Sequence, residues 1–330
     1  MTMFITGGTS SIGRILVRKL ASQGVPMRVM VRKGSNRSML DFPEVTVVDG
    51  DVNNTDAIRK GMEGCQFVTH MAAIVGHNVP EAEWWRVNRD GSRNVLQAAH
   101  DLHVDSVVQV SSISVLGYTQ PGEIADETRP IDTNKYVNLY QKTKHAADEV
   151  AQDYAAKGLP VKIVYPAFGY GCSQATSHPS LHDQTLLRMA AGKPTAIMGS
   201  GRNRLCLSYY NDTAAGLLLA HENGNAGEGY ILGNDNLTFK EIWDAVAEVL
   251  GKEPPRGHIP LLALRLISST SRLLTGKSVF PPDFFEMFSF NWCFSNQKAK
   301  KLLGWQPHSF LEGLRETWQE YQKQGWSRGN

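Results

Sequence analysis

A short apolar run followed by a glycine-rich turn opens the chain, and no other stretch limits the possible folds so strongly. Residues 3–5 are apolar, and residues 6–13 read TGGTSSIG. Apolar residues then recur at helical spacing, at Ile12, Ile15, Leu16 and Leu20. The pattern predicts a strand, a tight turn and a helix. Such a turn directs free backbone N–H groups and the positive end of a helix dipole at an anion, so we expect it to bind phosphate groups.

Apolar runs alternate with helix-like segments through the first half of the chain. This alternation predicts an α/β fold in which a parallel sheet is covered by helices on both faces, with ligand sites at the carboxyl ends of the strands. From residue 172 the pattern loosens, and one further strand is expected at 230–232. The expected strands of the first half are 27–31, 45–48, 67–71, 107–110 and 161–164.

A phenol and an ammonium are spaced four residues apart at Tyr140 and Lys144. On a helix this spacing places both on one face, about one turn apart. A nearby ammonium favours the phenolate and lowers the tyrosine pKa, which suits a proton shuttle for an alcohol or a ketone. The pair alone is weak evidence, because both residue types also suit an exposed helix face.

With these motifs the chain resembles the extended short-chain dehydrogenase/reductase superfamily, whose glycine pattern is Thr-Gly-x-x-Gly-x-x-Gly. Thr6, Gly7 and Gly13 match, whereas Ser10 replaces the middle glycine and brings a small side chain to where backbone usually faces phosphate. The resemblance implies a Rossmann-type doubly wound parallel sheet with a smaller, mostly helical C-terminal substrate lobe. Further matching segments are 51–52, 70–73, 88–95, 110–112 with 115–117, and Pro166.

The resemblance also implies the catalytic residues. Tyr140 exchanges the proton, Lys144 lowers its pKa and holds the nicotinamide ribose, and Ser112 donates a hydrogen bond to the reacting oxygen. Ser111 is the neighbouring candidate, but counting back from Gly117 favours Ser112. The implied cofactor-binding residues are Gly7, Thr9, Ser10, Ser11, Ile12, Gly13, Arg32, Asp51, Val52, Met71, Ala72, Ala73, Asn88, Tyr140, Lys144 and Pro166.

The end of the second expected strand decides between NADP and NAD. An acidic residue there binds the ribose hydroxyls of NAD, whereas a basic residue accepts a 2′-phosphate. Here Arg32, Lys33 and Arg37 cluster without a carboxylate, and arginine offers a forked set of donors suited to phosphate. We therefore expect NADP(H), with NAD possible. The plainer alternative is a solvated basic loop.

Composition limits the other partners. A formal net charge of +2 over 330 residues gives no reason to expect nucleic acid. The four cysteines form no metal-like pair, and the spacing of His70, His77, His178 and His182 is not that of metal ligands, so no metal is expected. No apolar stretch reaches the roughly 18 residues that an integral membrane segment needs. A strand beginning at residue 3 leaves no room for a signal peptide, and a cytoplasmic location is expected.

The substrate is expected to be an apolar ketone or alcohol. Members acting on sugar nucleotides usually read Val-Tyr-Gly where this chain has residues 115–117, and carry an arginine seven residues before an aspartate. Taking Asp212 as that aspartate puts Leu205 at the arginine position, with Arg204 displaced by one. The segments 229–233 and 236–241 are typical of dihydroflavonol-reductase-like and 3β-hydroxysteroid-dehydrogenase-like members, and also resemble epimerases of hopanoid gene clusters. The function expected is an NAD(P)-dependent secondary alcohol–ketone oxidoreductase; the alternatives are a nucleotide-sugar epimerase or dehydratase and a non-catalytic NADP(H) sensor.

Domain organisation and assembly follow from the same resemblance. We expect a dinucleotide-binding domain at 1–171, with 210–233 returning to it, and a substrate lobe at 172–209 and 234–330, whose helices include 238–250 and 295–303. A homodimer is expected through the helices at 91–102 and 140–156. Leucine-rich 259–274, broken by Arg265 and Arg272, predicts a basic amphipathic helix that packs in the lobe, covers an apolar substrate or rests on a membrane surface. Trp84 and Trp85 are interpreted as aromatic core, or as the lining of a substrate mouth.

Overall fold

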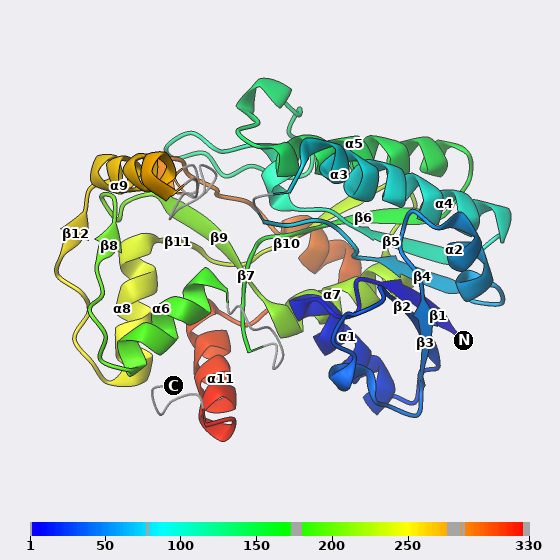
Figure 1. Ribbon diagram of the computed structural model, residues 1–330, viewed down its shortest axis with the longest axis horizontal. Coiled ribbons are helices and arrows are strands. Elements are labelled where there is room, and N and C mark those ends of the chain that lie inside the picture. The colour runs from blue at the N-terminus through cyan, green and yellow to red at the C-terminus, as the bar shows by residue number, and fades with distance from the viewer. Residues whose placement is uncertain (1, 77–78, 173–179, 276–284, 286–287, 326–330) are drawn as a thin grey trace.

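A seven-stranded parallel sheet forms the first lobe of the molecule (Figure 1). The computed structural model describes residues 2–76, 79–172, 180–275, 285 and 288–325. The strand order is β10-β6-β5-β4-β1-β2-β3, and every neighbouring pair runs parallel. This is the doubly wound order expected from the sequence, with the strand order reversing beside β1. The strands are β1 (Met3–Thr6), β2 (Met27–Val31), β3 (Val45–Asp49), β4 (Phe67–His70), β5 (Ser106–Val110), β6 (Val161–Pro166) and β10 (Gly229–Leu232).

Helices cover both faces of this sheet and create two apolar cores. Helices α1 (Ser11–Ser22) and α7 (Tyr210–Asn223) lie on one face, and α2 (Thr55–Met62), α4 (Gly91–Asp101) and α5 (Leu139–Ala156) on the other (Figure 1). Side chains of β1 alternate between the two cores, so Met3 and Ile5 pack with α1 and α7 while Phe4 packs with α2. Burial on both faces explains why these strands are nearly all apolar in sequence.

Short polar side chains fix where the helices of the first lobe begin. Ser10, Asn54 and Asn138 precede α1, α2 and α5, and each side chain accepts a hydrogen bond from a backbone N–H of the first turn. An N-cap of this kind contributes about 1 kcal/mol to helix stability. The cap at Asn138 places Tyr140 in the first turn of α5, at the carboxyl end of the sheet.

The second lobe is smaller and mostly helical, as the resemblance implied (Figure 1). Its helices are α6 (Leu181–Ala190), α8 (Phe239–Leu250), α9 (Leu261–Thr275) and α11 (Phe310–Lys323), joined by a three-stranded and a two-stranded sheet. A capping box formed by Thr238 and Glu241 starts α8, so the expected helix at 238–250 is confirmed. The small strands are β7 (Phe168–Tyr170), β8 (Ile197–Met198), β9 (Arg204–Tyr209), β11 (Asn236–Thr238) and β12 (His258–Ile259).

Two expected helices differ in their bounds. The helix expected at 295–303 begins later, and its last part, Ala299–Leu303, is a π-helix. Asn296 lies before it because its amide donates to Gly233 O and to Asn234 Oδ1, which ties this residue to the loop after β10. The amphipathic helix expected at 259–274 starts two residues later, because residue 259 pairs with β8. Within the part of the chain that the structure describes, no helix has the length and apolar character needed to span a bilayer.

Candidate active site

The glycine-rich turn between β1 and α1 is built so tightly that two of its glycines admit no side chain. Gly7 has φ of +74°, and a β-carbon there would lie 2.7 Å from the backbone nitrogen of Ala72. A β-carbon on Gly13 would lie 2.3 Å from the carbonyl oxygen of Gly7. Only glycine therefore lets α1 approach β1 and β4 this closely. The result is a backbone cradle at a helix N-terminus, which fits the pyrophosphate of a dinucleotide.

Ser10 replaces the middle glycine without strain. Its φ of −74° and ψ of 169° are open to any residue, and its Oγ accepts a hydrogen bond of 3.1 Å from Gly13 N. The serine thus serves as the N-cap of α1 while its side chain stays at the rim of the cradle. The departure from the family pattern changes a backbone contact into a capping hydroxyl and leaves the turn intact.

A crevice of about 560 Å³ extends from this cradle along the carboxyl ends of β1, β2, β3 and β4. It lies where the strand order reverses, which is where open α/β sheets bind their ligands. Its lining also includes residues that the sequence did not single out, among them Ser35, Ile74, Val75 and Val87. The predicted residues that line it are Gly7, Thr9, Ser10, Arg32, Asp51, Val52, Met71, Ala72 and Ala73.

The two arginines of the basic cluster after β2 have different surroundings. Arg37 pairs with Asp49 at the end of β3. Arg32 is exposed, lines the crevice beside Ser35, and forms no ion pair with the residues that the structure describes. One of the two arginines is therefore neutralised by the protein, and the other faces the crevice with its charge uncompensated.

Ser112 and Tyr140 meet at the carboxyl end of β5. The Ser112 hydroxyl lies close enough to the phenol of Tyr140 to lower its pKa, and it accepts a hydrogen bond of 3.0 Å from Ser114 Oγ. The hydroxyl of Ser111 points elsewhere and donates to Asp148 Oδ2 at 2.6 Å. Of the two serines considered from sequence, Ser112 is therefore the one that faces the phenol.

The expected effect of Lys144 on Tyr140 is not what the structure shows. Burial raises the pKa of Tyr140 to about 12, and the nearby Ser112 hydroxyl opposes this rise only in part. The ammonium of Lys144 donates instead to the carbonyl oxygen of Val110 at 2.6 Å, and burial lowers the pKa of Lys144 to about 8. In this state the phenol is held protonated, because its loss of solvent outweighs any nearby positive charge.

Asp148 completes this buried group and was missed from the sequence. It lies one helical turn after Lys144, only 4% exposed, and burial raises the pKa of its carboxyl to about 7 against the opposing charge of Lys144. Its Oδ1 accepts no hydrogen bond from the residues that the structure describes. The sequence signal was present, since a carboxylate four residues after a lysine falls on the same helix face.

The predicted residues that do not line the crevice support it from behind. Asn88 is buried; its Oδ1 accepts from Ile74 N at 2.7 Å, and its amide donates to Thr143 Oγ1 at 3.0 Å. It thereby joins the crevice wall to the helix that carries Tyr140 and Lys144. The others outside the lining are Tyr140 and Lys144 on α5, Ser11, Ile12 and Gly13, which begin α1, and Pro166, the buried last residue of β6.

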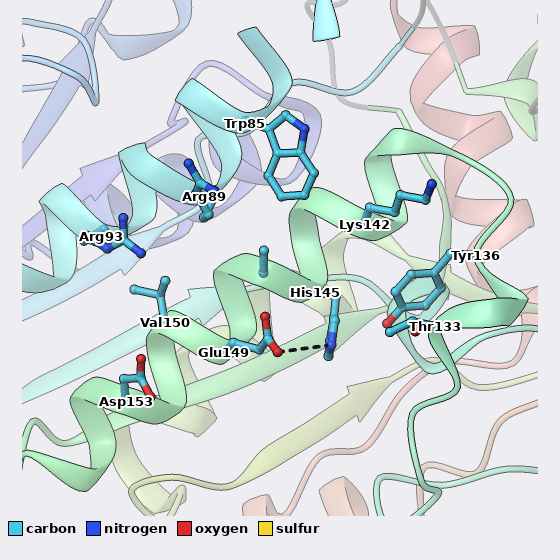
Figure 2. Close-up of a pocket in the computed structure, with 11 residues that line it drawn as sticks. Trp85, Arg89, Arg93, Thr133, Tyr136, Lys142, His145, Glu149, Val150 and Asp153 are labelled. Atoms are coloured by element: carbon cyan, nitrogen blue, oxygen red, sulfur yellow. Dashed lines mark ion pairs between the residues drawn. The ribbon is translucent and has the colours of Figure 1, made fainter. Parts of the chain in front are cut away.

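The two tryptophans of 84–85 have different surroundings. Trp84 is buried and its ring meets that of Tyr140 edge-on at 6.3 Å, so it packs directly against the candidate proton donor. Trp85 carries the guanidinium of Arg89 at 5.2 Å over its ring. Trp85 and Arg89 belong to a second hollow of about 750 Å³, which Figure 2 shows between the helical segment 85–101 and α5.

Histidines and acidic residues form no candidate metal site in the described ranges, where no three His, Cys, Asp or Glu side chains come together. His77 and His178 lie outside the described residues. His70 is buried and hydrogen-bonded to Thr6 and Ser92, and burial lowers its pKa to about 3. It serves as a neutral structural link between β1, β4 and α4.

The parallel sheet, the glycine cradle and the Ser112–Tyr140 pair together define a Rossmann-type dinucleotide-binding oxidoreductase. The model of the NAD dependent epimerase/dehydratase family matches residues 3–233. The chain belongs to this family, whose members are NAD-dependent enzymes, and the resemblance seen in the sequence is confirmed.

Three relatives are similar over most of the chain. A putative dihydroflavonol 4-reductase of Synechocystis is 30% identical, covering 98% of this chain and 95% of the relative. A 4-hydroxy-2-methyl-3-oxo-4-farnesyl-3,4-dihydroquinoline-1-oxide ketoreductase of Stigmatella aurantiaca is 27% identical, covering 80% of this chain and 78% of that protein. A 3β-hydroxysteroid dehydrogenase/Δ5→4-isomerase of Mycobacterium tuberculosis is 27% identical, covering 92% of this chain and 86% of the relative.

Solved structures share the whole architecture. The crystal structure of the protein gox2253 has a TM-score of 0.83 at 26% identity, covering 98% of this chain and 99% of its own. DesIV, a dTDP-glucose 4,6-dehydratase of Streptomyces venezuelae crystallised with NAD and TYD bound, has a TM-score of 0.79 at 24% identity, covering 99% of this chain and 98% of its own. The second likeness shows the common fold.

Proposed function

We propose that this protein is an NADP(H)-dependent oxidoreductase that interconverts a secondary alcohol and a ketone on an apolar small molecule. The observation that supports the proposal is the proximity of Ser112 and Tyr140 at the sheet edge that also bears the glycine cradle. A nicotinamide dinucleotide supplies or accepts the hydride when bound. The protein's own residues hold the substrate oxygen and move its proton.

The proposed roles follow from the protonation states. With a pKa of about 12, Tyr140 is a neutral phenol at neutral pH, so it is ready to give its proton to a carbonyl oxygen during reduction. Ser112 donates a second hydrogen bond to the same oxygen. Lys144 holds the ribose when it leaves Val110 O. These states favour the ketone-to-alcohol direction.

NADP(H) is proposed over NAD(H) because Arg32 and Ser35 line the crevice beside the end of β2. A guanidinium and a hydroxyl at this place can both donate to a 2′-phosphate. The pairing of Arg37 with Asp49 removes the other nearby arginine from this role. Arg32 is therefore the proposed 2′-phosphate ligand.

An apolar substrate is proposed in preference to a sugar nucleotide because the side chains of Arg204 and Asp212 already have partners within the protein. Arg204 donates to Asn236 O at 2.7 Å and pairs with Glu241, while Leu205, at the expected arginine position, is fully buried. Asp212 is paired with His308, whose Nδ1 lies 2.7 Å from Asp212 Oδ1. Arg204 and Asp212 are thus each held by other residues of the protein, and Leu205 offers no charge at the arginine position of the sugar-nucleotide members.

The test is turnover of the purified chain with NADPH or NADH and a panel of apolar ketones, beside UDP- and dTDP-sugars. We expect substrate-dependent loss of nicotinamide absorbance with ketones, and a fall of about 10²–10⁴-fold in Tyr140→Phe. Epimerised or dehydrated sugars by NMR, with no ketone turnover, would favour the sugar-nucleotide alternative. Biological activity that survives Tyr140→Phe but not Arg32→Ala would favour the sensor.

Two features of organisation belong to the same proposal. We propose that 1–171 and 210–233 form the cofactor domain, since β10 returns to the first sheet, and that 172–209 and 234–330 form the substrate lobe.

We also propose a homodimer through the hollow of Figure 2, where Arg89 and Arg93 face the side of α5 that carries Glu149 and Asp153. A symmetric contact can pair such charges between subunits. Light scattering should give a molecular mass twice that of one chain. The variant Glu149→Lys should lower this mass toward that of a single chain.

A further inference from the structure

Helix α9 presents four of its six leucines to the outside of the protein. Leu262, Leu266 and Leu273 are 69%, 60% and 86% exposed, whereas the buried positions of the helix include Leu264 and the polar Ser268. The hydrophobic effect within one chain would turn the leucines inward. Figure 1 places α9 at the outer end of the second lobe, away from the first sheet. This outward face needs another apolar surface to cover it.

The exposed apolar side chains form a narrow crest with a cation, Arg265, on one flank. At about 100° per residue, Leu262, Leu266 and Leu273 project within about 40° of one another, with Ile267 and Leu274 on one side. Ile267 is 52% and Leu274 is 77% exposed. Arg265 lies on the other side, exposed, with its guanidinium 5.8 Å from the ring centroid of Phe285. We call this surface the leucine crest.

The charge of the surrounding sequence selects among possible partners. Arg256 pairs with Glu253, but from residue 257 to residue 282 the chain contains no Asp or Glu and three Arg or Lys, at positions 265, 272 and 277. A second copy packed symmetrically on the crest would bring these cations together, and like charges repel. A surface that is apolar inside and anionic at its boundary complements both features.

We propose that the leucine crest of α9 rests on an anionic phospholipid bilayer, with the leucines among the acyl chains and Arg265 at the phosphates. An amphipathic helix of this kind lies in the interface plane and does not cross the membrane. The bilayer would hold the second lobe against the surface. Binding of this kind requires neither cofactor nor turnover.

The test is cosedimentation of the full chain with vesicles, without NADPH or ketone, so that it stands apart from the proposed reductase activity. We expect binding to phosphatidylglycerol/phosphatidylcholine vesicles that weakens in high salt and is much weaker on phosphatidylcholine alone. The double variant Leu266→Ser/Leu273→Ser should bind at least about tenfold less. The matched control, Ile124→Ser/Leu302→Ser, removes two exposed apolar side chains elsewhere and should bind like the wild type.

A second variant keeps the proposal falsifiable if the leucine variant fails to fold. Arg265→Gln should weaken binding to anionic vesicles by about fivefold while leaving the melting temperature unchanged, since one cation near such a surface contributes about 1 kcal/mol. Wild-type protein that stays in solution with anionic vesicles overturns the proposal. A smaller molecular mass in solution for the leucine double variant than for the wild type, measured without lipid, also overturns it. A second copy of the chain would then cover the crest.

Discussion

Asp148 accepts a hydrogen bond of 2.6 Å from Ser111 Oγ while lying one helical turn beyond Lys144 on the buried face of α5. The carboxylate and the ammonium are both withdrawn from water, and each favours the charged form of the other. This arrangement couples the serine strand end to the lysine that the mechanism requires. Ser111 and Ser112, adjacent in sequence, therefore serve different partners.

Asp148→Asn should shift the alkaline limb of the activity profile to lower pH by about one unit, because an opposite charge that favours the Lys144 ammonium is removed. In the wild type this limb should begin near the Lys144 pKa of about 8. The measurement is kcat against pH for ketone reduction. Glu222→Gln, which removes an exposed carboxylate of α7, is the matched control; an equal shift there would contradict the role of Asp148.

The same variant should change how stability depends on pH. The pKa of Asp148 rises from 3.8 to about 7 on folding, so between these values the folded chain binds more protons and its free energy of unfolding falls as pH rises. The asparagine side chain of the variant cannot titrate, so the fall should be smaller there. Melting temperatures from pH 4 to 7 measure the difference, and parallel curves for the two proteins would exclude it.

Ser112→Ala and Ser111→Ala should fail in different ways. Loss of Ser112 removes the hydroxyl beside the phenol and the proposed hydrogen bond to the substrate oxygen, so kcat should fall about 10²–10³-fold while cofactor affinity is kept. Loss of Ser111 raises the pKa of Asp148 further and should alter chiefly the pH profile. Steady-state kinetics across pH separate the two outcomes. Equal kcat losses at every pH would contradict the division of roles.

Gly13→Ala should abolish dinucleotide binding or folding of the first lobe, although alanine is normally the better helix residue by about 1 kcal/mol. The added β-carbon would meet Gly7 O at 2.3 Å, and backbone on both sides leaves little room for adjustment. Gly257→Ala, where no atom lies within 4 Å and φ is not positive, is the control and should bind normally. Cofactor titration by fluorescence and a melting curve provide the measurements.

The strands and the cradle could be predicted because they depend on local patterns. Buried strands require continuous apolar runs, and the turn at 6–13 requires glycine for contacts within its own neighbourhood. The pKa of Tyr140 could not be predicted, because it depends on how deeply the folded chain buries the phenol and on Lys144 turning toward Val110. The outward direction of α9 was equally hidden, since periodicity shows which residues share a face but not which face meets the protein.

Arg32→Ala should reverse the preference for NADPH over NADH, because its uncompensated guanidinium lines the crevice beside Ser35. Loss of a charged hydrogen-bond donor to a phosphate costs about 1.5–3 kcal/mol, or roughly 10–150-fold in NADPH affinity. NADH affinity should stay within about twofold, since the ribose hydroxyls carry no charge for the arginine to neutralise. Arg37→Ala is the matched control, because Asp49 already holds that side chain. Dissociation constants for both cofactors decide the matter: an equal loss for NADPH and NADH would mean that Arg32 supports the loop, and no loss for either would place the 2′-phosphate elsewhere.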